Sequence, residues 1–139
     1  DLTLFDKVTD ADGNVLEDYS PEVKGDMDVA DSTWTTVQEG MRGVATRNAT
    51  LSSLDVAVAG KTGTPQEDLS RPSHGLFIGF APYDDPEVAM AVRITNGYTS
   101  GNASSVAKDI FSYMYDLEDE SAIVTGTANT DNITTEQTD

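Results

Sequence analysis

The sequence predicts an α+β fold in which helices pack on a partial antiparallel sheet. Three short apolar segments follow one another within residues 56–95, and turn-forming residues separate the last two. Segments at 32–46 and 102–117 repeat apolar residues at helical spacing. Residues 3–19 indicate a separate N-terminal hairpin. We therefore expect three strands plus that hairpin, with helices packed against the sheet.

The N-terminal hairpin is predicted from a turn-forming run between two apolar stretches. This run is Asp10-Ala11-Asp12-Gly13-Asn14. A calcium-binding loop is the alternative interpretation of its acidic residues. The EF-hand loop requires its glycine five residues after the first Asp, whereas Gly13 comes three residues after Asp10. We therefore predict a turn and not a calcium site.

Residues Ser32–Thr46 are predicted to form an amphipathic helix. Its apolar residues share one helical face: Trp34, Val37, Met41, Val44 and Ala45. Asp31 or Ser32 suits the N-cap, because the side-chain oxygen of either residue can accept a hydrogen bond from a free backbone N–H. Gly40 and Gly43 lower the helix propensity or mark close packing against a neighbouring element.

The three strands are predicted at Val56–Thr62, Gly75–Ala81 and Val88–Thr95. The second is apolar along nearly its whole length, as expected for a strand covered on both faces. Residues 82–87 hold two prolines and two aspartates, which favour a turn. The second and third strands should therefore pair as an antiparallel hairpin.

A second helix is predicted after the third strand, with Asn102 as its N-cap. Its apolar stripe should pack on the sheet and consists of Ala103, Val106, Ala107, Ile110, Phe111, Met114 and Leu117. Residues 118–139 are acidic and rich in Thr and Asn, which predicts a disordered tail. The expected organisation is thus one domain over residues 1–117 and a tail over 118–139.

The composition of the 139 residues excludes several functions. With 25 acidic and 8 basic residues the net charge is −17, so nucleic acid is not an expected partner. The absence of cysteine excludes disulfides and thiolate chemistry, and no cofactor or metal is expected. The sequence begins at Asp1 without a signal peptide or an apolar run of membrane-spanning length. We expect the chain to come from a longer protein, with any membrane anchor outside it.

The run from Val58 to Thr64, Val-Ala-Gly-Lys-Thr-Gly-Thr, is the most informative stretch of the sequence. Gly60-Lys61-Thr62 matches the end of a phosphate-binding loop. That loop requires another glycine five residues before Gly60, where Asp55 stands instead. The nucleotide-binding interpretation therefore fails.

The same run matches the Lys-Thr-Gly element of serine penicillin-binding proteins and β-lactamases. Two further stretches accompany it in the same order: Val37-Gln-Glu-Gly-Met-Arg-Gly-Val-Ala-Thr46 before it, and His74-Gly-Leu-Phe-Ile-Gly-Phe-Ala-Pro-Tyr83 after it. Together they resemble the C-terminal part of the transpeptidase domain of class B penicillin-binding proteins. The resemblance covers about residues 5–117 and implies a fragment of the β-lactamase/transpeptidase-like fold.

The resemblance assigns roles to four residues that bind a peptide ending in D-alanine or the β-lactam that mimics it. The Lys61 ammonium would supply positive potential, and the Thr62 and Thr64 hydroxyls would bind the substrate carboxylate. Gly63 would let the substrate lie close to the strand. The backbone N–H of Thr64 would be one of two oxyanion-hole donors.

The nucleophile is not expected in this chain. In the family it lies in Ser-x-x-Lys, with a Ser-x-Asn element after it, and both precede the Lys-Thr-Gly strand. Here such patterns occur only after that strand, as Ser105-Val106-Ala107-Lys108 and Ser100-Gly101-Asn102. We interpret both as chance matches. His74, the only histidine, either lines the cleft or has a surface or packing role.

The function implied by the resemblance is crosslinking of D-Ala-D-Ala stem peptides by a peptidoglycan D,D-transpeptidase, through a seryl acyl-enzyme that penicillin also forms. This chain would be the substrate-binding part, inactive alone and completed by the upstream half of the same domain. The expected location is extracytoplasmic, with the parent protein anchored in the cell membrane. Alternatives are a β-lactamase or D,D-carboxypeptidase relative, a penicillin-sensing receptor domain, or a non-catalytic module. The resemblance implies a complete sheet of five strands, the first two of which come from sequence upstream of this chain, so Val88–Thr95 would have an open edge. We therefore expect the isolated chain to dimerise, rearrange or require a companion chain.

Overall fold

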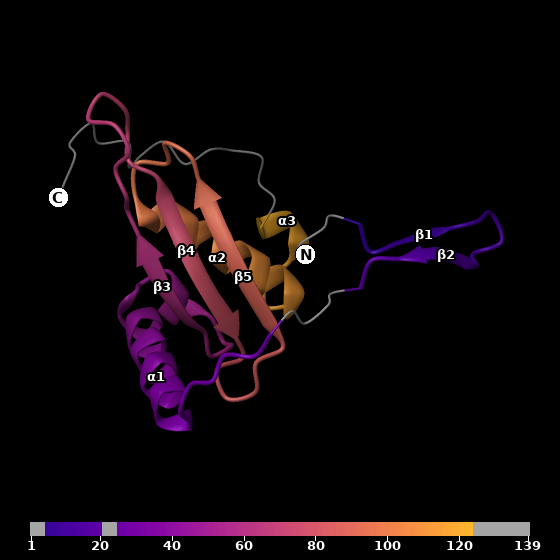
Figure 1. Ribbon diagram of the computed structural model, residues 1–139. Helices are drawn as coiled ribbons and strands as arrows, with labels where there is room; N and C mark the ends of the chain where they lie inside the picture. Colours follow the sequence, from indigo (N-terminus) through magenta and orange to yellow (C-terminus); the bar gives the residue numbers. More distant parts are fainter. Residues whose placement is uncertain (1–4, 21–24, 124–139) are drawn as a thin grey trace. The chain divides into compact units, whose positions relative to one another are not determined.

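The computed structural model describes residues 5–20 and 25–123 and confirms the α+β class (Figure 1). The chain divides into two compact units, Asp1–Ala30 and Asp31–Asp139. The first holds a two-stranded hairpin. The second holds a three-stranded antiparallel sheet with its helices. None of the helices in the described ranges combines the length and apolar character needed to cross a membrane.

The hairpin consists of β1 (Lys7–Thr9) and β2 (Val15–Asp18), which pair antiparallel. Its turn is closed by Asp10, whose Oδ1 accepts the backbone N–H groups of Asp12 and Asn14, each at 2.9 Å. The Asn14 amide donates to the other carboxylate oxygen at 2.9 Å. These hydrogen bonds lower the pKa of Asp10, chiefly the one from the Asn14 side chain. The carboxylate is thus engaged by the turn itself.

The sheet has the order β3-β4-β5, with β3 at Ala59–Gly63, β4 at Gly75–Ala81 and β5 at Val88–Ile94. The middle strand has the predicted bounds. The first strand begins three residues later than predicted, because residues 56–58 lie outside the ladder. In that segment the Ala57 carbonyl oxygen accepts the N–H of Tyr83 at 2.7 Å, and Val58 is fully buried.

The two faces of the sheet differ. The register places Phe77 beside Thr62 and Val92, and this face packs against α2 (Ser100–Met114). In Figure 1 α2 lies behind the sheet, so the opposite face is turned to the viewer. We refer to the opposite face as the uncovered face, because α2 does not cover it and its central residue Ile78 is 53% exposed; at the start of β3, Ala59 on this face is fully buried.

A glycine pair sets the position of β3 against the core. Gly60 and Gly79 stand directly opposite each other in the ladder. A Cβ on Gly60 would lie 2.5 Å from the Phe77 ring, and one on Gly79 would also lie 2.5 Å from it. The two glycines therefore leave space for the fully buried Phe77 ring to lie against the backbone, and a larger residue at either position would fill that space.

Helix α1 spans Asp31–Arg47, one residue longer at each end than predicted. Its C-terminal half packs near β3, where Ala45 is buried. In the N-terminal half Trp34 and Val37, predicted to face the core, are 41% and 49% exposed. Arg42 joins the helix to the sheet unit, because its Nη1 donates to the Val58 carbonyl oxygen at 2.8 Å.

The connection from α1 to β3 contains a 3₁₀ turn, η1 (Leu51–Ser53), which the sequence analysis did not predict. The Asn48 side-chain oxygen holds its start by accepting the N–H groups of Thr50 and Leu51 at 3.0 and 3.1 Å. Leu51 is 2% exposed and belongs to the core. The turn therefore brings an apolar anchor under the sheet just before β3.

Helix α2 begins two residues before the predicted cap. Thr99 is the N-cap and its side chain accepts the N–H of Gly101 at 3.3 Å. The expected cap, Asn102, lies in the first turn and donates from Nδ2 to the Gly97 carbonyl oxygen at 2.8 Å. A short helix, α3 (Glu120–Ile123), follows within the segment predicted as tail. The rest of that tail, 124–139, lies outside the described residues.

Candidate active-site strand

The Lys-Thr-Gly-Thr run lies at the C-terminal end of β3, which forms one border of the described sheet. Lys61 and Gly63 pair with Ile78 and Leu76, so they belong to the uncovered face. Thr62 pairs with Phe77 and belongs to the covered face. Lys61 and Thr64 are exposed and Thr62 is half-buried. The four predicted residues are therefore contiguous along one strand end, with the Lys61 and Thr62 side chains on opposite sides of the strand.

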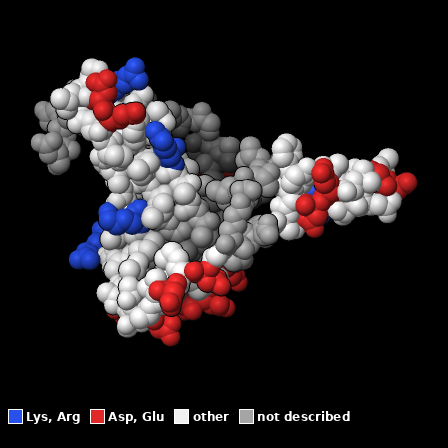
Figure 2. Space-filling view, viewed as in Figure 1, with Lys and Arg blue, Asp and Glu red and all other residues white. Residues whose placement is uncertain are grey.

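Lys61 has no acidic partner within 4 Å in the described residues. Its ammonium donates to the carbonyl oxygen of Thr62 at 2.6 Å, which uses one of its three hydrogens. The other two remain available for a ligand. In a chain with net charge −17 this exposed cation stands out. Figure 2 shows basic side chains on this face of the strand unit between two groups of acidic ones.

Thr64 is positioned by the loop between β5 and α2. Its hydroxyl oxygen accepts the backbone N–H of Ser100 at 3.1 Å, a contact between residues 36 positions apart. A hydroxyl that accepts one hydrogen bond can still donate its own hydrogen. The Thr64 O–H is thus oriented and free to donate to an anionic ligand. The sequence analysis missed this contribution, because a backbone N–H leaves no residue-type signal.

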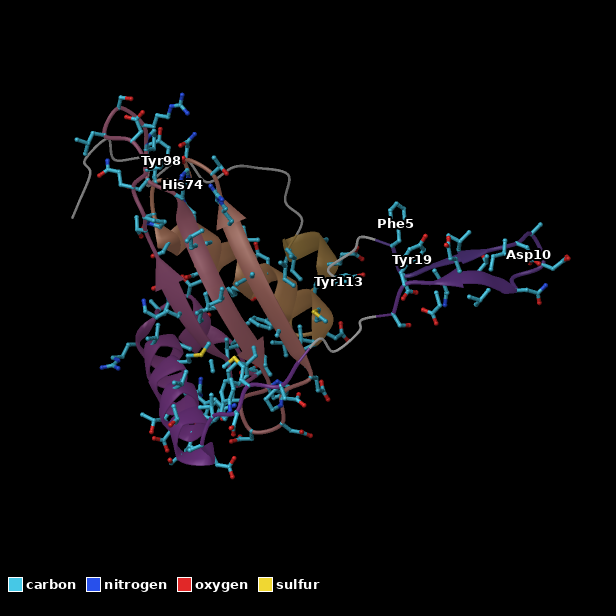
Figure 3. The ribbon with its side chains drawn as sticks, viewed as in Figure 1. Phe5, Asp10, Tyr19, His74, Tyr98 and Tyr113 are labelled. Atoms are coloured by element: carbon cyan, nitrogen blue, oxygen red, sulfur yellow. The ribbon has the colours of Figure 1, made fainter. Side chains whose placement is uncertain are left out.

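His74 joins three segments at this end of the sheet. Its backbone N–H donates to the Pro65 carbonyl oxygen at 2.9 Å, and its Nδ1 accepts the N–H of Asn96 at 3.0 Å. Since Nδ1 accepts, the neutral ring carries its hydrogen on Nε2 and donates it to Glu67 Oε2, 3.0 Å away. The side chain is buried, at 7% exposure. Figure 3 shows His74 and Tyr98 at this end of the unit. His74 thus has the packing role that the sequence left open, and it also lines a cavity described below.

The loop that leads from Thr64 to His74 contains a compact turn at Asp68. The Asp68 Oδ1 accepts the N–H of Ser70 at 2.8 Å and its hydroxyl at 2.7 Å. These bonds lower the pKa of Asp68, the backbone bond most strongly. The turn is therefore formed at neutral pH with an ionised carboxylate.

The late Ser-x-x-Lys match lies on the other side of the sheet from Lys61. Ser105 and Lys108 belong to α2, which packs on the covered face through Ala103, Ala107 and Phe111. The Ser105 hydroxyl donates to the Gly101 carbonyl oxygen at 3.2 Å, and Lys108 pairs with Glu118 at 2.8 Å. The two residues are therefore engaged within the helix region and do not approach the Lys-Thr-Gly strand. Ser100 reaches that strand through its backbone, as described for Thr64.

A charged residue of β5, Arg93, also belongs to this region and was missed. The ladder places Arg93 opposite Leu76, which in turn is opposite Gly63. All three belong to the uncovered face that carries Lys61. The available signal was a single arginine inside an otherwise apolar strand. In residues 5–20 and 25–123 no three His, Cys, Asp or Glu side chains gather in a way that could hold a metal ion.

Comparison with known proteins was made for the sequence and for the fold. A profile of the family described as the penicillin binding protein transpeptidase domain matches residues 1–116. The chain is similar to the peptidoglycan D,D-transpeptidase MrdA of Acinetobacter baumannii, with 36% identity over 111 residues. That match covers 68% of this chain but 16% of the relative.

Several solved structures share the fold. The D,D-transpeptidase domain of a peptidoglycan glycosyltransferase from Eggerthella lenta matches with a TM-score of 0.62 and 26% identity, over 81% of this chain and 27% of that one. Pseudomonas aeruginosa PBP2 in complex with WCK 5153 matches with a TM-score of 0.60 and 28% identity, over 85% and 26%. The chain thus spans about a quarter of each of these structures.

Proposed function

Because the chain belongs to the family of penicillin-binding protein transpeptidase domains, we propose that it is the C-terminal, substrate-binding part of a peptidoglycan D,D-transpeptidase. The observation that carries the proposal is the Lys61-Thr62-Gly63-Thr64 run at the end of a border strand, with Lys61 and Thr64 exposed and Lys61 on the uncovered face of the sheet. A cation, two hydroxyls and an open strand edge suit an extended peptide that ends in a carboxylate.

The proposed reaction divides one acyl transfer into two steps. A serine from the upstream half attacks the carbonyl between the two terminal D-alanines of a stem peptide, and the last D-alanine leaves as the amine. The amine of a second stem peptide then attacks the resulting ester, which forms the crosslink and frees the serine. A β-lactam would enter the same first step.

The residues of this chain hold the substrate in the first step and polarise the attacked carbonyl in both steps. The Thr64 hydroxyl, which Ser100 orients, and the Thr62 hydroxyl bind the terminal carboxylate, while the Lys61 ammonium supplies positive potential. The Thr64 backbone N–H donates to the oxyanion that develops at the attacked carbonyl. One such donor lowers an acyl-transfer barrier by about 3–4 kcal/mol.

The upstream half of the same domain is the partner that completes the site. It would cover the face of the sheet that carries Lys61, where Ile78 is 53% exposed and Ala91 beside it in the ladder is also exposed. It would also supply the serine. Because the proposed substrate is peptidoglycan, we propose that the parent protein acts outside the cytoplasm. Sequence beyond this chain would anchor it to the cell membrane.

The first test is intact-mass spectrometry of the 139-residue chain after incubation with a penicillin. We expect no mass gain, because the nucleophile lies upstream. A longer chain that includes the upstream half should gain one penicilloyl group and retain it. Rapid release of the adduct would instead indicate a β-lactamase or carboxypeptidase.

The matched variants are Lys61→Met and Lys108→Met in the longer chain. Loss of the Lys61 cation should slow acylation by about tenfold to a hundredfold, the range of a hydrogen bond to a charged group. Lys108→Met, on the opposite side of the sheet, should leave the rate unchanged. Equal rates for both variants, or a penicilloyl adduct on the short chain, would contradict the proposal.

A further inference from the structure

A cavity of about 280 Å³ lies next to the C-terminal end of β3, directly beyond Thr64. It is lined by Pro65, Gln66, Glu67, His74, Leu76 and Arg93. Leu76 and Arg93 stand opposite each other in the ladder, on the face of the sheet that carries Lys61. The cavity therefore continues the uncovered face past the Lys-Thr-Gly run.

The cavity carries two opposite charges that do not neutralise each other. Arg93 is exposed and makes no salt bridge or side-chain hydrogen bond with any described residue. Glu67 has a side chain that is 79% exposed, and no lysine or arginine approaches it within 4 Å in the described part of the chain. The guanidinium and the carboxylate thus line one cavity without forming an ion pair.

His74 holds the acidic side of the cavity in place. Its Nδ1 is engaged by the Asn96 N–H, so the Nε2 hydrogen is directed to Glu67 Oε2. This bond fixes one carboxylate oxygen and leaves Oε1 without a partner among the described residues. The buried histidine thereby orients a carboxylate whose second oxygen is available to a ligand.

The remaining walls consist of Gln66 and of two apolar residues. Leu76 and the Pro65 ring provide carbon surface between the two charges. A ligand with a single charge would pair with the cavity group of opposite sign, but the group of like sign in the same cavity would repel it. A ligand with both an ammonium and a carboxylate avoids this cost.

We propose that this cavity binds an amino-acid zwitterion, with its carboxylate on Arg93, its ammonium on Glu67 and its aliphatic carbons against Leu76 and Pro65. The planar guanidinium offers two parallel N–H donors to a carboxylate. Residues 65–67 directly follow the Lys-Thr-Gly-Thr run. We infer that this zwitterion is the end of a side chain of the bound peptide, and this inference rests on the proposed function. The preference of the cavity for a zwitterion is independent of the proposed function.

The probe is D-norvaline, compared with N-acetyl-D-norvaline, which lacks the ammonium, and D-norvaline methyl ester, which lacks the carboxylate. Binding to the longer chain that includes the upstream half is followed by NMR at the His74 ring, the Leu76 methyls and the Arg93 side chain. D-norvaline should give saturable shifts below roughly 100 mM, where even a millimolar site is filled. Each singly charged derivative should bind at least about tenfold more weakly, as expected for loss of one charge-assisted hydrogen bond.

Two variants separate the two charges. Glu67→Gln can still accept from His74 but removes the negative charge, so it should abolish the preference for D-norvaline over its N-acetyl derivative. Arg93→Met should abolish the preference over the methyl ester. Arg71→Met and Asp85→Asn, exposed positions outside the cavity, serve as matched controls and should change neither preference.

Three outcomes would overturn the inference: no saturable shifts at the cavity residues, equal binding of all three compounds, or equal effects of the cavity and control variants. Shifts confined to the amides of residues 61–64 would likewise assign the ligand to the Lys-Thr-Gly strand and not to the cavity. A failure of the acylation test in the longer chain would overturn the proposed function and leave these shifts unchanged. The two proposals therefore fail separately.

Discussion

Phe77 determines where the end of β3 lies. Its ring is fully buried on the covered face and occupies the space above the Gly60–Gly79 pair. Gly60 immediately precedes Lys61, so the position of the proposed substrate-binding run depends on this contact. A side chain at either glycine would have to displace the ring or the neighbouring backbone, since the Ile78 carbonyl oxygen lies 2.9 Å from a Cβ on Gly60.

The variant Gly60→Ala should therefore destabilise the chain by about 1–3 kcal/mol, the usual cost of overpacking a filled core. The matched control is Gly40→Ala in α1, where an added Cβ meets nothing within 4 Å. That substitution should stabilise by about 0.5–1 kcal/mol, because alanine is the better helix residue. Urea unfolding measures both, and a neutral Gly60→Ala would show that the ring can move aside.

The residues of the candidate site were unequally predictable. Lys61, Thr62, Gly63 and Thr64 form a contiguous run, so their spacing along the chain was enough to single them out. Arg93 and Ser100 come from other segments and reach the same region through strand register and a loop contact. Such neighbours depend on tertiary structure, which a single sequence does not display.

At the scale of elements, the C-terminal end of α2 is joined to the end of β4 by Tyr115. Its hydroxyl donates to the Ala81 carbonyl oxygen at 2.9 Å, and the ring lies 6.4 Å from that of Phe111. Burial raises the pKa of the Tyr115 phenol above its ordinary value, with the nearby Glu87 adding to the effect. The folded chain therefore holds the phenolic proton more tightly than the unfolded chain does.

This contact predicts a loss of stability in alkali. The contribution of a raised pKa is complete below the unfolded value of about 10 and disappears as the pH rises through the folded value. Tyr115→Phe should cost about 1 kcal/mol near neutral pH, because the Ala81 carbonyl loses its donor. The difference in unfolding free energy between the two proteins should shrink above pH ~10. Tyr113→Phe, 63% exposed on the same helix, is the control, and an equal loss there would contradict the role of Tyr115.

The bounds of strands and helices were predicted from the sequence less accurately than their existence. The apolar strand β4 had the predicted bounds, but it is not covered on both faces as its apolar run suggested, because Ile78 on the uncovered face is 53% exposed. The first strand was predicted to begin too early in the sequence. Val56 and Val58 are apolar because they pack in or against the core, although both precede the hydrogen-bonded strand. The cap of α2 moved from Asn102 to Thr99 because both residue types suit an N-cap and tertiary contacts decide between them.

At the scale of the whole molecule, the strand unit has one covered and one uncovered sheet face. On this unit the apolar side chain of Ile78 is exposed, and the outer edge of β5 pairs with no further strand among the described residues. The chain spans 16% of its Acinetobacter relative, which is consistent with a surface that belongs inside a larger domain. Exposed strand edges and apolar faces favour association with another chain.

We therefore expect the isolated chain to dimerise or rearrange unless the upstream half is supplied. Size-exclusion chromatography with light scattering measures the oligomeric state. Ile78→Glu should weaken association without unfolding the chain, because the Ile78 side chain is exposed on the uncovered face and is not part of the buried core. Val106→Glu, 39% exposed on α2, should leave association unchanged. A well-folded monomer of the original chain would contradict this expectation.

The contact between Thr64 and Ser100 has a consequence for how such a protein changes under antibiotic selection. The hydroxyl proposed to bind the substrate carboxylate is oriented by a backbone N–H that lies 36 positions later in the chain. That N–H belongs to the first residue of α2, which follows a loop that contains Gly97 and Tyr98, the latter with a positive φ of 65°. If the chain takes part in β-lactam binding as proposed, resistance can arise from inherited changes at residues 97–100 that reorient the hydroxyl while the Lys-Thr-Gly-Thr run stays intact.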